Sequence, residues 1–136
     1  MATTPKKYRV LIVDDEPTVV QFAERTLQIA GYETITADDG DSALVAAGQC
    51  DHVDLLLTDL VMPNMPGDEL ARTLRRQDPD LPVLYLTGFS DRLFKDRSQL
   101  WANEAYVDKP ISMNALLEAV SLALFGHTKG PSTASS

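Results

Sequence analysis

The chain of 136 residues contains one cysteine, one tryptophan and no long hydrophobic run. A single cysteine, Cys50, excludes an internal disulfide and a metal site built from several cysteines. No apolar stretch approaches the ~20 residues that span a membrane. The first residues are polar and lack the apolar core of a secretory signal, so the sequence predicts a cytoplasmic protein.

Basic residues are also scarce, with 12 Lys and Arg against 20 Asp and Glu and a formal net charge of −8. This balance argues against sequence-independent binding to nucleic acid or to an anionic membrane. It favours metal cations and basic partner surfaces instead. The apolar fraction of 44% is that of an ordinary globular protein, and the length suits one domain with a substantial core.

Short apolar runs alternate with helical patterns, which is typical of βαβ units and a parallel sheet. The apolar runs lack polar alternation, as expected for strands covered on both faces. We predict strands at Tyr8–Val13, Tyr32–Ala37, Val53–Thr58, Val83–Thr87 and Glu104–Val107. We predict helices at Thr18–Ala30, Asp41–Gly48, Gly67–Gln77, Asp91–Ala102 and Ser112–Phe125.

This order of elements predicts an α/β fold of the flavodoxin-like (βα)5 type. Its sheet would be doubly wound, with five parallel strands in the order 2-1-3-4-5, because right-handed crossovers leave few other arrangements. We expect one domain over residues 8–126. Residues 1–7 and 127–136 are predicted to be flexible ends, since they are polar and the second segment is rich in Gly, Ser and Thr.

Polar residues stand at or just after the ends of four of the predicted strands, at the sheet edge where α/β proteins place their chemistry. Asp14 and Asp15 follow the first strand and Asp59 the third, while Thr87 ends the fourth and Lys109 follows the fifth. Carboxylates supply the oxygen ligands that Mg²⁺ prefers, and a hydroxyl and an ammonium group bind phosphoryl oxygens. The pattern therefore predicts a Mg²⁺-dependent phosphoryl site.

From about Tyr8 to Phe125 the sequence resembles the receiver domain of two-component response regulators. Each matching motif alone is common, but together, in this order and at strand ends, they are specific. The motifs are Asp14-Asp15-Glu16-Pro17, Thr58-Asp59 with Met62-Pro63-x-Met65-x-Gly67, Leu86-Thr87-Gly88, and Tyr106-x-x-Lys109-Pro110.

The resemblance implies a signalling switch that catalyses only its own phosphorylation and dephosphorylation. Asp59 would accept a phosphoryl group from a histidine kinase or a histidine phosphotransfer protein. Mg²⁺ (or Mn²⁺) would be bound by Asp15, Asp59 and the backbone carbonyl of Val61, with Asp14 acting through a water. Lys109 would pair with Asp59 at rest and with a phosphoryl oxygen afterwards, and the Thr87 hydroxyl would bind another oxygen.

The resemblance also implies how the signal would spread. Tyr106 would turn inward as Thr87 moves, and the face formed by the fourth helix, fifth strand and last helix would change. Pro110 would follow a cis peptide bond. Val61 and Phe89 would flank the path of the hydrolytic water, and because neither side chain can orient water, we expect slow self-dephosphorylation.

The last predicted helix carries more apolar residues than one buried face needs. One stripe comprises Met113, Leu116, Leu117, Val120 and Leu124, and a second comprises Ala115, Ala119, Leu122 and Phe125. The second stripe is either a set of scattered surface residues or a surface for a homodimer or a target. A further departure from the family is Asn103, which stands where many receivers have glycine before the fifth strand.

Two other functions fit the sequence less well. A phosphatase with Asp14 as nucleophile would place its catalytic acid two residues later, where this chain has Glu16 followed by Pro17. The chain also leaves no room for the cap domain of such enzymes. A module that kept the fold but lost the chemistry is disfavoured, because every expected acid and the lysine are present. We expect no output domain after the last helix. A single-domain regulator and a receiver from a hybrid kinase both remain open, as do the kinase, stimulus and target.

Overall fold

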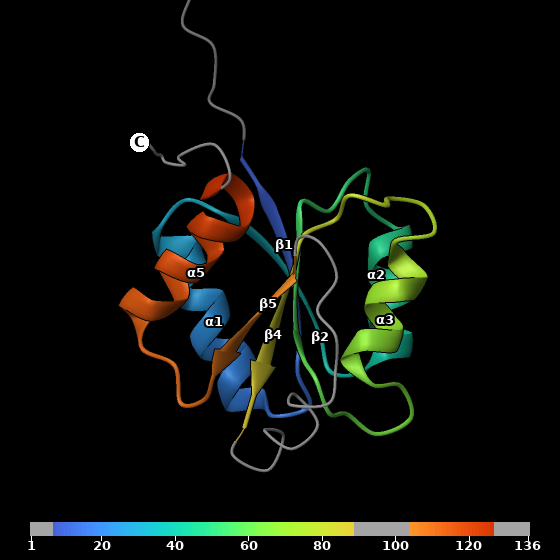
Figure 1. Ribbon diagram of the computed structural model, residues 1–136, viewed down its shortest axis with the longest axis horizontal. Coiled ribbons are helices and arrows are strands. Elements are labelled where there is room, and N and C mark those ends of the chain that lie inside the picture. Colours follow the sequence, from blue (N-terminus) through green and yellow to red (C-terminus); the bar gives the residue numbers. More distant parts are fainter. Residues whose placement is uncertain (1–6, 89–103, 127–136) are drawn as a thin grey trace, which may run out of the picture.

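The structure of the protein, a computed structural model, describes residues 7–88 and 104–126 (Figure 1). One sheet contains β1 (Arg9–Val13), β2 (Glu33–Ala37), β3 (Leu55–Asp59), β4 (Val83–Thr87) and β5 (Glu104–Asp108). The strand order is β2-β1-β3-β4-β5, and every neighbouring pair is parallel. The predicted fold class and strand order are therefore confirmed, with the switch point between β1 and β3.

Helices cover both faces of the sheet, as Figure 1 shows. The described helices are α1 (Pro17–Ile29), α2 (Gly40–Gly48), α3 (Gly67–Leu74) and α5 (Met113–Phe125). α1 and α5 lie on one face, and α2 and α3 on the other. The predicted helix Asp91–Ala102 lies outside the described residues, and so do Phe89, Asn103 and residues 127–136.

β4 has the predicted boundaries, and those of the other described elements differ from the predicted ones by at most three residues. The largest difference is at α3, which ends at Leu74 rather than at Gln77. There the backbone N–H of Gln77 donates to the carbonyl of Leu74, a tighter turn than that of an α-helix. Arg75 follows the last helical residue, and its guanidinium donates two hydrogen bonds to the Leu81 carbonyl.

The core consists of two apolar layers, one on each face of the sheet. Leu11 and Val13 of β1 pack with residues of α2 and α3, whereas Val10 and Ile12 pack with residues of α1 and α5. Alternate residues of one strand thus enter different layers, because successive side chains point to opposite faces. This explains why the three central strands β1, β3 and β4 are mainly apolar, whereas the edge strands β2 and β5 are only partly buried and carry more polar residues. None of the described helices is long and apolar enough to cross a membrane.

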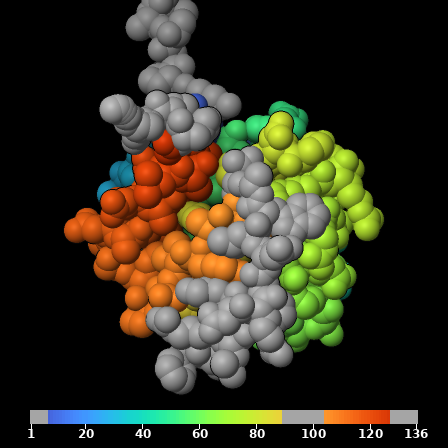
Figure 2. All heavy atoms as spheres, in the orientation of Figure 1, coloured from blue at the N-terminus to red at the C-terminus, as the bar shows by residue number. Residues whose placement is uncertain are grey.

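The two predicted stripes of the last helix are placed differently by the fold. Leu116 and Val120 are fully buried, whereas Met113 of the same stripe is 44% exposed. Leu122, from the second stripe, is 55% exposed, and Figure 2 shows α5 (red) and β5 (orange) side by side at the surface. Phe125 packs edge-on against Tyr8, with ring centroids 5.0 Å apart, so it belongs to an internal contact.

Candidate functional site

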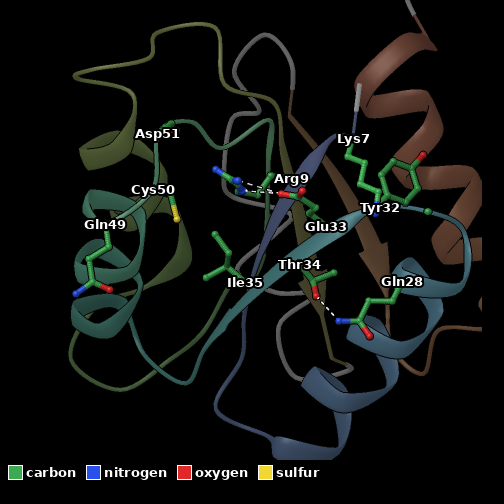
Figure 3. A pocket seen from close by; sticks show the side chains of 11 residues that line it. Lys7, Arg9, Gln28, Tyr32, Glu33, Thr34, Ile35, Gln49, Cys50 and Asp51 are labelled. Carbon is green, nitrogen blue, oxygen red and sulfur yellow. Dashed lines mark hydrogen bonds and ion pairs between the residues drawn. The ribbon is translucent and has the colours of Figure 1, made fainter. Parts of the chain in front are cut away.

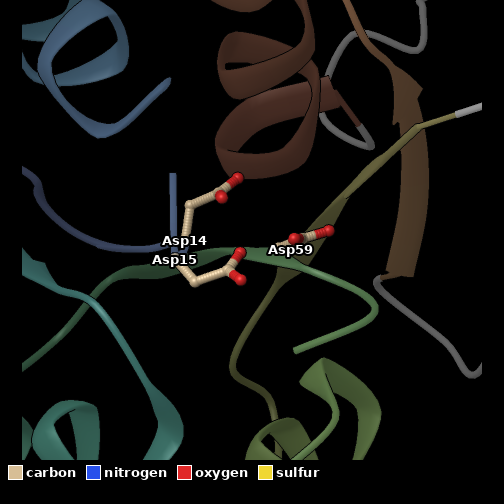
Figure 4. A group of neighbouring side chains, drawn as sticks. All are labelled: Asp14, Asp15 and Asp59. Carbon is tan, nitrogen blue, oxygen red and sulfur yellow. The ribbon is translucent and has the colours of Figure 1, made fainter. Parts of the chain in front are cut away.

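Three carboxylates meet where β1 and β3 end. Val13 lies opposite Thr58 in the parallel register, so Asp14 and Asp15 emerge beside Asp59 (Figure 4). One oxygen of each carboxylate lies within 4.8 Å of the others. Asp14 and Asp59 are buried and Asp15 is exposed. The sheet therefore brings together the three acids that the sequence singled out.

Burial of Asp14 disfavours the ionised form of its carboxyl group. Burial raises the pKa of the Asp14 carboxyl above its usual value of 3.8, and this effect outweighs the hydrogen bond from the Glu16 N–H and the attraction of Lys109. A carboxylate that is costly to ionise here gains more from a nearby cation than an exposed one does. The donor set is entirely oxygen, which suits a hard divalent cation. The cluster could thus hold a metal ion.

Lys109 lies beside the carboxylates and contacts three acids. Its Nζ is 2.9 Å from Oε1 of Glu16, 3.0 Å from Oδ2 of Asp14 and 3.6 Å from Oδ2 of Asp59. Burial acts to lower the pKa of Lys109, but the bonds to Glu16 and Asp14 and the charge of Asp59 raise it overall. The ammonium group therefore stays charged across the physiological pH range.

The motifs predict Asp59 as the partner of Lys109 and do not predict Glu16. Glu16 directly follows the two predicted acids in the Asp-Asp-Glu run, but the run does not indicate which of its acids the lysine contacts. The position of Lys109 is fixed from the other side by the sheet, where its backbone N–H donates to the Thr87 carbonyl at 2.7 Å. The peptide bond between Lys109 and Pro110 is cis.

Thr87 is fully buried at the end of β4, and its hydroxyl is directed at β5. It donates to Oδ1 of Asp108 at 2.9 Å, and the Val107 carbonyl lies 3.5 Å away. Asp108 was not among the predicted site residues. Tyr106 is half-buried, and its ring lies 5.6 Å from that of Tyr85 with an interplanar angle of 38°.

The segment after β3 packs directly on the backbone of Asp59. The Gly67 N–H donates to the Leu60 carbonyl at 2.8 Å, which places the start of α3 against the end of β3. A Cβ atom at Gly67 would overlap the carbonyl oxygen of Asp59. Only glycine therefore permits this approach. Val61, which lies between Asp59 and Gly67 in the chain, is 50% exposed.

Hollows elsewhere on the described part of the protein do not offer a comparable constellation. One of about 650 Å³ runs along β2 (Figure 3), where Arg9 pairs with Glu33 at 3.0 Å and Gln28 donates to Thr34 at 2.9 Å. These polar groups are thus paired with each other. A second hollow, of about 550 Å³, adjoins the carboxylates between α1 and β2 and includes Asp14 in its lining. Glu24 and Asp38 line it as well, so the hollow beside Asp14 is acidic.

Comparisons with known proteins agree with this fold and identify the family. A family model described as the response regulator receiver domain matches residues 10–121. The sensor protein EvgS of Escherichia coli (strain K12) is 37% identical over 84% of this chain and 9% of its own length. The response regulator receiver protein CpdR of Brucella abortus is 34% identical over 85% of this chain and 96% of its own.

A solved structure of the chemotaxis response regulator CheY4 of Vibrio cholerae has a TM-score of 0.78 at 32% identity, covering 88% of this chain and 100% of that one. The chain belongs to the family of response regulator receiver domains, which are regulatory modules of two-component signalling. It spans about half or less of the length of several curated relatives that it matches.

Proposed function

We propose that Asp59 accepts a phosphoryl group from the phosphohistidine of a histidine kinase or a histidine phosphotransfer protein. The observation that carries this proposal is the position of the Asp59 carboxylate. It is 5% exposed, lies within 4.8 Å of two further carboxylates, and has a lysine ammonium 3.6 Å away. A nucleophile, a cation site and a fixed positive charge thus converge, which is what phosphoryl transfer requires.

In this reaction an Asp59 oxygen forms a bond to phosphorus while the bond from phosphorus to the histidine nitrogen breaks, and the nitrogen keeps the electron pair. The product is an acyl phosphate. Lys109 would turn from Glu16 toward a phosphoryl oxygen, and Thr87 would donate to another. Asp15, Asp59 and the Val61 carbonyl would hold Mg²⁺ (or Mn²⁺), with Asp14 acting through a water, and the ion would supply positive charge near the phosphoryl oxygens.

The response would follow from the movement of Thr87. Tyr106 would turn inward, and the surface of β5 and α5 would change its affinity for a target or a second copy of the chain; the fourth helix of the predicted surface lies outside the described residues. Val61 offers no group that orients water, which favours a slow loss of the phosphoryl group. Phe89, the second residue expected to flank the path of the hydrolytic water, lies outside the described residues. A cytoplasmic location also stays a prediction.

Intact-mass measurement after incubation with acetyl phosphate and Mg²⁺ tests the proposal. The parent should gain one phosphoryl group, and Asp59→Asn should gain none. Asp51→Asn is the matched control, because it removes an exposed acid a few residues before the same strand. Chelation of the metal should suppress the gain. Equal labelling of Asp59→Asn and the parent would contradict the proposal.

A further inference from the structure

The hydroxyl of Thr87 makes a bond that the proposed phosphorylation would have to break. This hydroxyl has one proton, and it donates that proton to Oδ1 of Asp108 at 2.9 Å. Thr87 is fully buried, so water does not compete for the proton. A phosphoryl oxygen on Asp59 and the carboxylate of Asp108 are therefore alternative acceptors for a single donor.

The register of the sheet makes this contact a direct cross-strand pair. Thr87 lies opposite Asp108, and two residues earlier Tyr85 lies opposite Tyr106. Residues two apart on a strand share a face, so the two pairs form consecutive rungs on the same face of β4 and β5. The ring contact of 5.6 Å between the tyrosines is thus the immediate neighbour of the hydroxyl bond.

We propose that Asp108 is a latch on Thr87, a positioning residue that keeps the hydroxyl from Asp59 until a phosphoryl group competes for it. The inference rests on the proposed function and adds a regulatory element to the same site. Opening the latch frees Thr87 beside Tyr106, which is where the proposed response begins. The charge of Asp108 favours its bond to Thr87, because hydrogen bonds to a carboxylate are stronger than those to neutral acceptors.

The latch is suited to opening because its two members are differently exposed. Asp108 is exposed, so water replaces the lost bond when Thr87 leaves. Thr87 is buried, so its hydroxyl needs another acceptor; the Val107 carbonyl at 3.5 Å is a long one, and a phosphoryl oxygen supplies a stronger one. Removing the carboxylate should consequently tighten the binding of a phosphoryl mimic by roughly threefold to tenfold, the size of one modest hydrogen bond.

A double-mutant cycle with beryllofluoride and Mg²⁺ tests the latch. Calorimetry gives the affinity of four proteins: the parent, Asp108→Ala, Thr87→Val and the double variant. Asp108→Ala should bind the mimic more tightly than the parent, while Asp108→Ala in the Thr87→Val background should change nothing, since valine has no hydroxyl to hold. Asp108→Asn, which keeps a neutral acceptor, should give a smaller gain and replaces the alanine variant if that one folds poorly.

Two results would overturn the latch. No tightening in Asp108→Ala and Asp108→Asn would show that the bond does not oppose binding. Equal tightening in both backgrounds would show that Asp108 acts only through its charge on the anion. Failure of the proposed function looks different, because the parent would then not bind beryllofluoride, or Asp59→Asn would bind it as well as the parent.

Discussion

At the scale of single residues, the donors of the site are held by acids that flank it. Lys109 contacts Glu16 more closely than Asp59, and Thr87 donates to Asp108. The motifs identify the donors because residue type and spacing decide which groups can bind a phosphoryl oxygen. They do not identify the acceptors, because a flexible side chain selects among several nearby acids by small differences in distance.

Replacing Asp14 by asparagine should stabilise the metal-free protein at neutral pH. Burial raises the pKa of Asp14 in the folded state, so its favourable contribution is present below the unfolded value of 3.8 and is lost as the pH rises through the raised value. The asparagine side chain carries no charge to desolvate. The advantage of Asp14→Asn should therefore grow from acid to neutral pH.

Urea unfolding at several pH values in the presence of a chelator measures this advantage. Asp38→Asn, which removes an acid just after the neighbouring strand β2, is the control. An advantage that is absent at neutral pH, or one of equal size at every pH, would show that desolvation of Asp14 does not govern the metal-free site.

At the scale of elements, two junctions hold α3 against the sheet. Gly67 starts α3 against the Asp59 backbone, and Arg75 follows its end. Arg75 Nη1 lies 2.9 Å from Oε2 of Glu104, and the Tyr85 hydroxyl donates to the same oxygen at 3.1 Å. The ion pair is buried, with exposed side-chain fractions of 8% and 7%. It ties α3 to the first residue of β5.

Gly67→Ala should destabilise the protein by about 1–3 kcal/mol, the usual size of overpacking, and should also slow phosphorylation. The added methyl group collides with the Asp59 carbonyl, so relief requires the nucleophile or α3 to move. Gly48→Ala is the matched control, since a Cβ there meets nothing within 4 Å. It should gain roughly 0.5–1 kcal/mol from helix propensity.

Denaturant unfolding and the rate of labelling by acetyl phosphate give the two readouts for these glycine variants. If Gly67→Ala matched Gly48→Ala in both, the close approach at Gly67 would not constrain the site.

Arg75→Met should lower the free energy of unfolding by about 3–5 kcal/mol, because it removes the Arg75 guanidinium from the buried carboxylate of Glu104. Arg72→Met is the control on the same helix. Arg72 is half-exposed and lies 3.7 Å from Asp68, so its loss should change the stability by less than about 0.5 kcal/mol. Chemical unfolding of both variants decides the matter, and similar small losses would contradict a structural role for the buried pair.

At the scale of the whole molecule, acidic charge makes the fold responsive to cations. The chain carries a net charge of −8, and one group of its acids lies within 4.8 Å at the switch point of the sheet. Mutual repulsion of carboxylates and the burial of Asp14 both oppose folding in the absence of a cation. Metal binding and stability are consequently expected to be coupled.

Mg²⁺ at a hundredfold excess over its Kd should raise the free energy of unfolding by about 2.7 kcal/mol. Asp15→Ala should lose this response and, without metal, should be as stable as the parent or more stable, because it removes a ligand and relieves repulsion. Thermal melts with chelator, with Mg²⁺ and with NaCl of equal ionic strength separate specific binding from screening. A strong loss of stability in chelator would show a structural role for Asp15.

The sequence by itself determined the topology and which polar residues stand at the carboxyl edge of the sheet. Apolar runs without polar alternation predict buried parallel strands, and right-handed crossovers then fix the order in which they lie. Since strand ends meet at one edge, Asp14, Asp15 and Asp59 had to converge. These features are local or follow from chain connectivity, so they can be read without coordinates.

Only the tertiary structure decided which charged groups meet. Arg75 and Glu104 are separated by 29 positions and Lys109 and Glu16 by 93, and nothing in their local sequences specifies these pairs. The bond between Thr87 and Asp108 depends on the register of β4 and β5, which sets opposite each other two residues that lie 21 positions apart. Contacts of this kind arise because packing fixes the distances between side chains, and a one-dimensional pattern carries no such distances.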